Sequence, residues 1–420
     1  MKYAVVTFGC RVNQADSFVI EDQLRRRGAR QAPPEQADLV IVNTCSVTAS
    51  AEQGARQTIR RVARTNPDVK VVVTGCYATR QPRELDAIAN VVRVVANDAK
   101  DTLVDDLDID MTTAARFDGG DGPCGLLLAP GTGGRTALTL RVQTGCNETC
   151  SYCIIPRTRG AGRSRPMSEV VHDIRRAVAA GYREIAITGV HLGSYGRDLA
   201  DGTTLARLVR VLSEWPDDVL FRISSLEPMD CPRDLIEAAE HSPRIAPHFH
   251  LPLQHGSDAI LSAMNRPYTA SYYRDLIHEI RARLPGASIG TDIIVGFPGE
   301  SPVHFDVMRS MVQKLPLSYL HVFPYSDRPG TSAEQLPDKI HGQDIRERSR
   351  TIRAIGEQKV REFHASQVGR TLRALVVDDG QSVVTGNYLK VRLDEQRPRN
   401  SWVSIRVEGS DPLRGAALLQ

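Results

Sequence analysis

The 420-residue sequence lacks the features that mark membrane and secreted proteins. No apolar run approaches the roughly 20 residues that a membrane-spanning helix needs. Met1–Cys10 passes directly into an apolar run, without a basic stretch followed by a long apolar one, so no signal peptide is expected. These absences predict a cytoplasmic protein with no membrane partner.

An excess of charge of one sign is also missing, and so are internal repeats and long low-complexity tracts. The formal net charge of +3 is too small to require a nucleic-acid partner, and it does not oppose one. Charged residues make up 25% of the chain, an ordinary share for a globular protein. The length predicts two or three domains.

The eight cysteines are not expected to form disulfides, because the cytoplasm keeps thiols reduced. Metal binding or catalysis is therefore the better interpretation. Six of them form two sets of three, which are Cys10, Cys45 and Cys76, and Cys146, Cys150 and Cys153. Cys124 and Cys231 fit neither set and are expected to be free thiols.

Short apolar runs alternate with helical periodicity through residues 1–116. The expected strands are Tyr3–Phe8, Leu39–Asn43, Val69–Thr74 and Val91–Ala96, and the expected helices include Asp16–Arg27 and Ala49–Arg64. This alternation predicts an α/β domain with a doubly wound parallel sheet. A stretch rich in glycine and proline then predicts a linker over residues 117–134.

A second alternating series occupies residues 135–365. Its expected strands are Leu138–Gln143, Glu184–Thr188, Val219–Ile223, His248–Leu253, Ser288–Val295 and Tyr319–Phe323. Six such units predict an incomplete (βα)6 parallel barrel, because full closure takes eight. In residues 366–420, short strands are expected at Thr371–Val377, Ser382–Val384, Leu389–Leu393 and Trp402–Val407. These strands predict a small all-β barrel.

Cys146, Cys150 and Cys153 lie in TGCNETCSYCIIP, Thr144–Pro156, directly after the first expected barrel strand. Their CxxxCxxC spacing allows three thiolates in one loop to wrap a single metal centre. A structural zinc site usually has four ligands, often as two CxxC pairs. Three thiolates on a four-iron cluster leave one iron open to an outside ligand. A zinc loop and buried free thiols are the alternatives.

This segment resembles the radical S-adenosylmethionine superfamily, in which the open iron binds the amino and carboxylate groups of S-adenosylmethionine. In that superfamily, electron transfer cleaves the sulfonium and releases a 5′-deoxyadenosyl radical. The resemblance continues along the barrel, mostly at carboxyl ends of strands, where barrel enzymes keep their chemistry. It implies contacts to S-adenosylmethionine from Tyr152, Thr188, Gly189, Ser224, Ser225, Glu227, Gln254 and Gly296.

Cys10, Cys45 and Cys76 are far apart in the sequence, but each follows one of the first three long expected strands. Parallel strands end at the same edge of a sheet, so these cysteines should converge at the crevice where such folds bind ligands. Three ligands again imply a cluster with an open iron, which can hold sulfide. Zinc with three thiolates and water is the competing interpretation, and buried free thiols are a further one.

The three-part arrangement resembles the methylthiotransferase family over nearly the whole chain. This resemblance implies two 4Fe-4S clusters, an auxiliary one on the first cysteine set and a radical one on the second. It also implies a C-terminal RNA-binding barrel of the TRAM type. In that family one S-adenosylmethionine methylates cluster-held sulfur, and a second supplies the radical that takes hydrogen from carbon 2 of an adenine. No residue is singled out as a catalytic acid or base.

Five segments resemble the bacterial threonylcarbamoyladenosine branch of that family. They are Gly9–Ser17, Gly189–Leu199, Arg222–Pro228, Met264–Thr269 and His321–Thr331. The resemblance implies N6-threonylcarbamoyladenosine next to the anticodon of tRNA as substrate. It also implies a flavodoxin- or ferredoxin-like electron donor, a sulfur source and a monomeric chain. The alternatives are N6-isopentenyladenosine in tRNA, an aspartate of a ribosomal protein, and a noncatalytic zinc protein that binds RNA.

Arg157, Arg159, Arg163 and Arg165 cluster after the second cysteine set. They are expected to face a polyanionic substrate, because arginine pairs with phosphate bidentately; a solvated loop is the alternative. Tyr388 and Trp402 could stack on a base or belong to the barrel core. Thr144 and His255 depart from the family pattern, which usually has an acidic residue and a serine at these positions.

Overall fold

The computed structural model describes residues 1–107, 130–131 and 136–418. These residues form two compact units. The first contains residues 1–107, 139–148 and 154–163, and the second contains residues 130–131, 136–138, 149–153 and 164–418. Cys124 and most of the expected linker lie outside the described residues.

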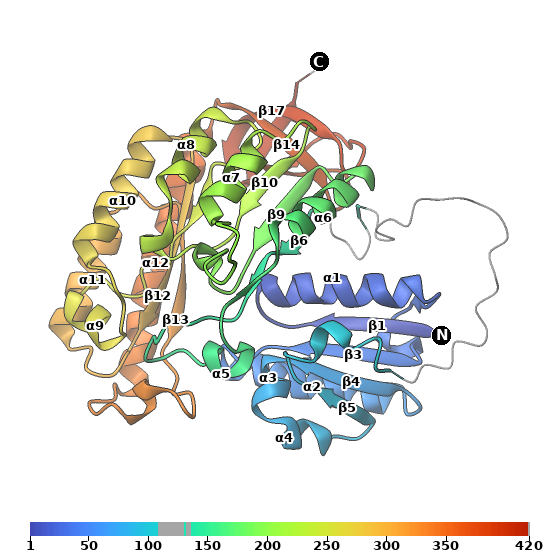
Figure 1. Cartoon of the computed structure of the whole chain (residues 1–420). Coiled ribbons are helices and arrows are strands. Elements are labelled where there is room, and N and C mark those ends of the chain that lie inside the picture. Colours follow the sequence, from blue (N-terminus) through green and yellow to red (C-terminus); the bar gives the residue numbers. More distant parts are fainter. Residues whose placement is uncertain (108–129, 132–135, 419–420) are drawn as a thin grey trace. The chain divides into compact units, whose positions relative to one another are not determined.

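The first unit is built on a five-stranded parallel sheet (Figure 1). Its strands are β1 Lys2–Thr7, β2 Arg30–Gln31, β3 Leu39–Thr44, β4 Lys70–Gly75 and β5 Val91–Val95, in the order β2-β1-β3-β4-β5. Every residue of the central strand β3 is buried, as in a sheet that is covered on both faces. The four expected strands form, and the short edge strand β2 was not expected.

Helices cover both faces of this sheet. Ile20 of α1, Arg11–Arg26, packs against Ile41 of β3 on one face. Ile59 of α2, Ala49–Thr65, packs against Val40 on the other face, because successive residues of a strand point to opposite sides. The predicted doubly wound sheet is therefore confirmed. Helix α1 begins at Arg11 rather than at Asp16, which makes Cys10 its N-cap residue.

The second unit contains the barrel strands. They are β9 Glu184–Thr188, β10 Leu220–Ile223, β11 His248–His250, β12 Ser288–Val295 and β13 Tyr319–Pro324. β9 pairs in parallel with β10, and β12 pairs in parallel with both β11 and β13. The first strand of the series, β6 Leu138–Arg141, belongs to the first unit except for Leu138. All six expected strands are present, and the incomplete parallel barrel is confirmed.

Helices follow the barrel strands in the expected alternation. They are α6 Met167–Ala179, α7 Leu205–Ser213, α8 Arg233–His241, α9 Asp258–Ala263, α10 Ala270–Arg283 and α11 Pro302–Lys314. The helix that comes next, α12 Gly342–Gln367, was not expected. Only a few of its residues are buried, so its apolar stripe is too thin to predict from periodicity. No described helix has both the length and the apolar character needed to cross a bilayer.

A closed five-stranded barrel ends the described chain, as predicted. Its strands are β14 Thr371–Val377, β15 Ser382–Thr385, β16 Lys390–Leu393, β17 Trp402–Ser410 and β18 Leu413–Ala417. β18 was not expected, because the segment LRGAA has no β-branched or aromatic residue. Its pairing with β16 and β17 completes the ring.

His255, which departs from the family pattern, is a fully buried side chain. Its Nδ1 accepts a hydrogen bond from the backbone nitrogen of Ser257 at 3.0 Å. Its Nε2 has no hydrogen-bond partner among the described residues. Burial, together with the nearby His304, lowers the pKa of His255 to about 3, so this imidazole is neutral at neutral pH.

We expect His255 to make the folded state less stable as the pH falls from 6.5 toward 3. The imidazole binds a proton near pH 6.5 in the unfolded chain but only near pH 3 in the folded one, so the unfolded state holds more protons between these values. Urea titrations across this range should show a steeper loss of stability in wild type than in His255→Ser. Equal slopes would contradict this. His278→Ser, at an exposed position of α10, should keep the wild-type slope.

Candidate metal and cofactor site

The cysteines of the first set follow three parallel strands at one edge of the sheet. Cys10 lies three residues after β1, Cys45 directly follows β3, and Cys76 begins the short helix α3, Cys76–Arg80. β1, β3 and β4 are neighbours in the sheet, so their carboxyl ends lie side by side. Cys45 and Cys76 are buried, and Cys10 is exposed. An external molecule could therefore reach this edge from the side of Cys10.

Two glycines allow the cysteine loops to approach one another. Gly9 has a φ of +92°, and a Cβ atom placed on it would lie 2.5 Å from Cys45 Sγ. Gly75 has a φ of +101°, and its Cβ would lie 2.2 Å from the backbone oxygen of Thr44. A larger residue at either position would be strained and would push the loops apart. The loop that carries Cys45 therefore packs closely against the loops that carry Cys10 and Cys76.

Nitrogen donors point at the sulfur atoms of this set. The backbone nitrogen of Val47 lies 3.5 Å from Cys45 Sγ, and Asn97 Nδ2 lies 3.5 Å from Cys76 Sγ. Hydrogen bonds to ligating sulfur tune an iron–sulfur centre. Burial raises the pKa of the Cys45 thiol to about 11, so this thiol must release a proton when it ligates a metal.

Asp16 of α1 is the centre of a buried ion cluster in the same unit. Lys100 Nζ lies 2.9 Å and Arg159 Nη2 lies 3.0 Å from Asp16 Oδ2. Arg141 Nη1 lies 2.5 Å from Asp16 Oδ1. Burial alone would raise the pKa of this carboxyl, but the charges of the three cations hold it well below its ordinary value.

This ion cluster is linked to the cysteine loops by Asn13. Asn13 Nδ2 donates to the backbone oxygens of Phe8 and Thr44, at 2.8 and 2.9 Å, and Asn13 Oδ1 accepts from Arg159. Burial lowers the pKa of Arg159, but the charges of Asp16, Cys76 and Cys10 raise it above its ordinary value. The three cations outnumber the two carboxylates that pair with them, Asp16 and the exposed Asp101, so they favour additional negative charge on the neighbouring sulfur atoms.

The expectation that Arg159 faces a polyanion is wrong. Arg159 is the last residue of helix α5, Ile155–Arg159, and its guanidinium is buried against Asp16. Arg165 is also engaged, since its side chain pairs with Asp173 at 2.8 Å. The sequence analysis did not identify Asp16 or Lys100 as functional residues. A usable signal was present for Asp16, because it lies on the buried face of α1, where apolar residues are expected.

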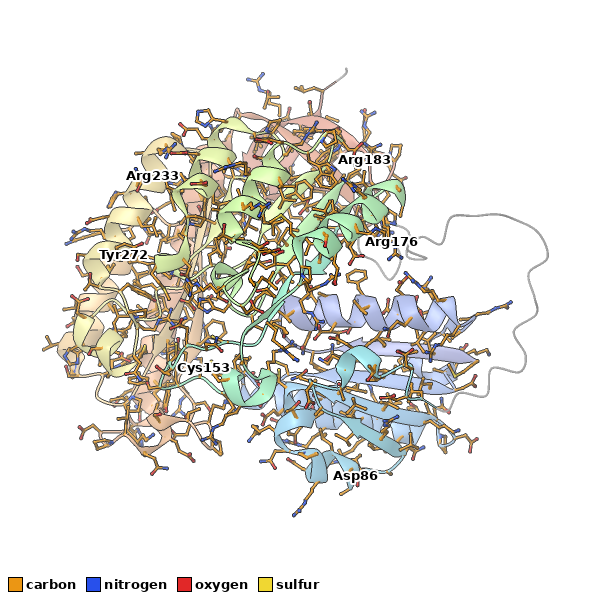
Figure 2. The ribbon with its side chains drawn as sticks, in the orientation of Figure 1. Asp86, Cys153, Arg176, Arg183, Arg233 and Tyr272 are labelled. Carbon is orange, nitrogen blue, oxygen red and sulfur yellow. The ribbon has the colours of Figure 1, made fainter. Side chains whose placement is uncertain are left out.

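In the second set, Cys150 and Cys153 lie in a turn held by Ser151, and Figure 2 labels Cys153. The backbone nitrogen of Cys153 bonds to the oxygen of Cys150 at 3.1 Å. Ser151 bonds through its backbone nitrogen to Met264 and through Oγ to Ala263, at 3.1 and 2.8 Å. These bonds fasten the turn to the end of α9.

One arginine reaches a sulfur atom of this turn. Arg266 Nη1 lies 2.9 Å from Cys150 Sγ, and its Nη2 pairs with the carboxylate of Glu227. Glu227 is one of the expected contacts to S-adenosylmethionine, and here its carboxylate already has a partner. In the other unit, Cys146 Sγ accepts from the backbone nitrogen of Glu148 at 3.4 Å.

Four further residues that are expected to contact S-adenosylmethionine lie close to the carboxyl ends of strands, as predicted. Thr188 ends β9 and is followed by Gly189, and Ser224 and the exposed Ser225 follow β10. Ser224 Oγ is buried without a hydrogen-bond partner among the described residues. An unpaired buried hydroxyl is costly unless a ligand satisfies it, so Ser224 fits a cofactor contact.

Tyr152, Gln254 and Gly296 have structural roles that would suffice without a cofactor. Tyr152 packs against an apolar cluster that includes Phe297. Gln254 has a φ of +65°, and its backbone forms a bridge with Ile293. A Cβ on Gly296 would lie 2.4 Å from a carbon of Ile345. These three remain predicted contacts to S-adenosylmethionine.

We expect Asp16→Asn to destabilise the protein by about 3–5 kcal/mol, because it leaves Lys100 and Arg159 buried without a counterion. Urea titration of purified wild type and variant would measure this loss. Asp101→Asn is the matched control, since Asp101 is exposed and pairs with Arg141 at 2.8 Å. The control should lose at most about 1 kcal/mol. A similar loss in both variants would contradict the importance of the buried cluster.

Two known protein families match separate parts of the chain. Residues 2–97 match the uncharacterized protein family UPF0004, and residues 140–312 match the radical SAM superfamily. The chain is 34% identical to the threonylcarbamoyladenosine tRNA methylthiotransferase MtaB of Aquifex aeolicus, over 97% of this chain and 100% of that protein. The protein of the same name from Bacillus subtilis is also 34% identical, over 92% of this chain and 88% of its own length.

Other relatives are named after a different substrate. The tRNA-2-methylthio-N(6)-dimethylallyladenosine synthase of Acidothermus cellulolyticus is 33% identical, over 98% of this chain and 84% of that protein. Among solved structures, the radical S-adenosylmethionine methyltransferase TsrM of Kitasatospora setae aligns with a TM-score of 0.56. That alignment covers 79% of this chain and 77% of TsrM at 15% identity, which shows a shared fold.

Proposed function

The chain belongs to the family of radical S-adenosylmethionine tRNA methylthiotransferases, and from that premise we propose that it modifies N6-threonylcarbamoyladenosine next to the anticodon of tRNA. The reaction places a methylthio group on carbon 2 of the adenine and uses two S-adenosylmethionine per product. The observation that carries the methylthiotransferase chemistry is the set of three cysteines at one sheet edge, in a chain that also contains the CxxxCxxC motif. The substrate is supported by the names of the relatives from Aquifex aeolicus and Bacillus subtilis.

We assign each cysteine set to its own 4Fe-4S cluster. Cys10, Cys45 and Cys76 would hold the auxiliary cluster, and Cys146, Cys150 and Cys153 would hold the radical cluster. When bound, the first cluster supplies the sulfur site and the second supplies the electron that cleaves S-adenosylmethionine. Cys124 and Cys231 stay outside this assignment, and burial raises the pKa of the Cys231 thiol to about 12, which makes it a poor nucleophile.

The protein's own residues would orient these groups and balance their charge. Lys100 and Arg159 stabilise negative charge at the sheet edge, and their burial keeps water from screening them. Arg266 fixes the position of Cys150 and neutralises part of its charge. Ser224 supplies a hydroxyl to the adenosine or methionine part of the cofactor. No acid–base residue is assigned, because none of these steps requires one.

The domain boundaries and partners complete the proposal. Residues 1–116 carry the auxiliary cluster, 117–134 form a linker, 135–365 form the radical core, and 366–420 form a TRAM-like RNA-binding barrel. The partners are tRNA, a flavodoxin- or ferredoxin-like electron donor and a sulfur source, in the cytoplasm, with the chain as a monomer. The closed β14–β18 barrel supports the last domain.

The proposed substrate is tested by anaerobic assay of the reconstituted protein with S-adenosylmethionine, a reductant and sulfide. Three anticodon stem-loop RNAs are compared, which carry N6-threonylcarbamoyl-, N6-dimethylallyl- or unmodified adenosine. Mass spectrometry should find a methylthio group only on the first RNA. Methylthiolation of the dimethylallyl RNA alone would defeat the proposed substrate and leave the enzyme class intact. Cys146→Ala should abolish both the product and the formation of 5′-deoxyadenosine.

A further inference from the structure

Strands β11, β12 and β13 present a polar face that the cluster assignment does not use. The register places Asp292 opposite His321, and Gly290 opposite both His250 and Tyr319. Because side chains alternate across a sheet, these residues lie on the same face. The opposite face is covered by helices, as the contact between Leu320 and Gly356 of α12 illustrates. The polar face therefore points into the half-barrel.

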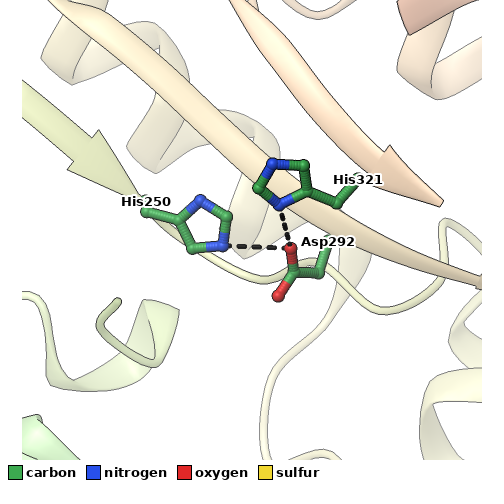
Figure 3. Close-up of side chains that lie close together, drawn as sticks. All are labelled: His250, Asp292 and His321. Atoms are coloured by element: carbon green, nitrogen blue, oxygen red, sulfur yellow. Dashed lines mark hydrogen bonds and ion pairs between the residues drawn. The ribbon is translucent and has the colours of Figure 1, made fainter. Parts of the chain in front are cut away.

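Asp292 holds two imidazoles on this face (Figure 3). Its Oδ1 lies 3.0 Å from His250 Nε2 and 3.2 Å from His321 Nδ1. Burial raises the pKa of Asp292, but the hydrogen bonds from His250 and His321 outweigh it and lower the pKa to about 2. An ionised carboxylate only accepts hydrogen bonds, so both nitrogens that face it carry hydrogen. The carboxylate thus fixes the orientation and the tautomer of each ring.

The second nitrogen of His250 is already engaged. Tyr319 Oη lies 3.1 Å from His250 Nδ1 and 2.9 Å from His248 Nε2. Gly290 leaves room for this tyrosine, because a Cβ there would lie 2.0 Å from the phenol ring. The chain of bonds from His248 through Tyr319 to His250 and Asp292 is a preformed polar network.

The C-terminal barrel helps to enclose this network. The ring of Tyr388 lies 4.9 Å from the ring of His248, and the Arg222 guanidinium lies 4.7 Å from the ring of Tyr388. Arg222 is itself buried and bonds to Glu184 at 2.8 Å. Tyr388 is nevertheless 47% exposed, so it is not part of the barrel core, and its stacking on a base stays a prediction.

His321 differs from the other members of the network in its exposure. Its side chain is 57% exposed, compared with 13% for His250. Its Nδ1 faces Asp292, and its Nε2 has no hydrogen-bond partner among the residues that the structure describes. The network therefore ends on one oriented imidazole nitrogen that is accessible to a ligand.

We propose that His321, oriented by Asp292, binds the threonylcarbamoyl substituent of the substrate adenosine. This inference rests on the proposed function. The threonylcarbamoyl group carries a carboxylate, a hydroxyl and amide N–H groups, whereas a dimethylallyl group carries no polar atom. Neutral His321 accepts from the hydroxyl or an amide N–H through Nε2, and protonated His321 donates to the carboxylate. A dimethylallyl group would desolvate this nitrogen without pairing it, so the site selects the polar substituent.

Binding of the same three stem-loop RNAs to the cluster-loaded protein tests this inference. His321→Phe keeps an aromatic ring but removes both nitrogens, and it should weaken binding of the threonylcarbamoyl RNA by about 10- to 100-fold, the effect of one hydrogen bond to a charged group. Affinity for the unmodified RNA should not change. His278→Phe, at the exposed position of α10, is the matched control and should bind all three RNAs as wild type does.

Two further readouts separate the possible failures. Iron content and 5′-deoxyadenosine formation without RNA should be the same in wild type and His321→Phe, which shows that the variant is folded and loaded. If wild type modifies the threonylcarbamoyl RNA and His321→Phe binds it with unchanged affinity, the inference fails and the proposed function stands. If wild type modifies only the dimethylallyl RNA, the proposed substrate fails, and the inference fails with it.

A metal ion is the competing occupant of this polar face. One ligand atom from each of His250, Asp292 and His321 lies within 4.8 Å of the others, a spacing that zinc could also use. About one zinc per chain in wild type, lost in both His321→Phe and Asp292→Asn, would overturn the inference in favour of a metal site. Zinc-free wild type with weakened RNA binding in His321→Phe would support it.

Discussion

Strands that run parallel end at the same edge of their sheet, and the proposed chemistry of this protein depends on that constraint. In the first unit it places Cys10, Cys45 and Cys76 after three neighbouring strands, although they are widely separated in sequence. In the second unit, Ser224 follows β10 and the Gly296 turn follows β12, each at the carboxyl end of its own strand. The helices and the buried faces of both sheets fix the strand register, and the register sets which side chains meet.

The proposed cluster site would place negative charge at one edge of the first unit, and buried cations lie close to that edge. If the three cysteines ligate a cluster as proposed, their thiolates bring negative charge to an edge where Cys45 and Cys76 are buried. Lys100 and Arg159 provide the opposite charge, and Asp16 keeps both cations in position without cancelling them. A single substitution in this network therefore affects folding and the sulfur site together.

The sequence predicted the parts of the fold that follow from strong local patterns. The β-branched runs predicted the main strands, and the sequence correctly placed Cys10, Cys45 and Cys76 after three of them. Helix α12 and strand β18 could not be predicted, because one is mostly exposed and the other lacks residues typical of strands. The role of Arg159 was misjudged, since a charged residue in a loop-like segment gives no sign that a distant carboxylate will bury it. The polar network that ends on His321 depends on register across three strands, which no single segment encodes.

The central claim is that each cysteine set holds its own four-iron cluster. Iron and acid-labile sulfide should be measured in anaerobically purified wild type and in two variants, each with one set of three cysteines changed to alanine. The account predicts about eight irons in wild type and about four in each variant, with sulfide falling in parallel. Zinc in place of iron, or iron lost from only one of the two variants, would contradict it.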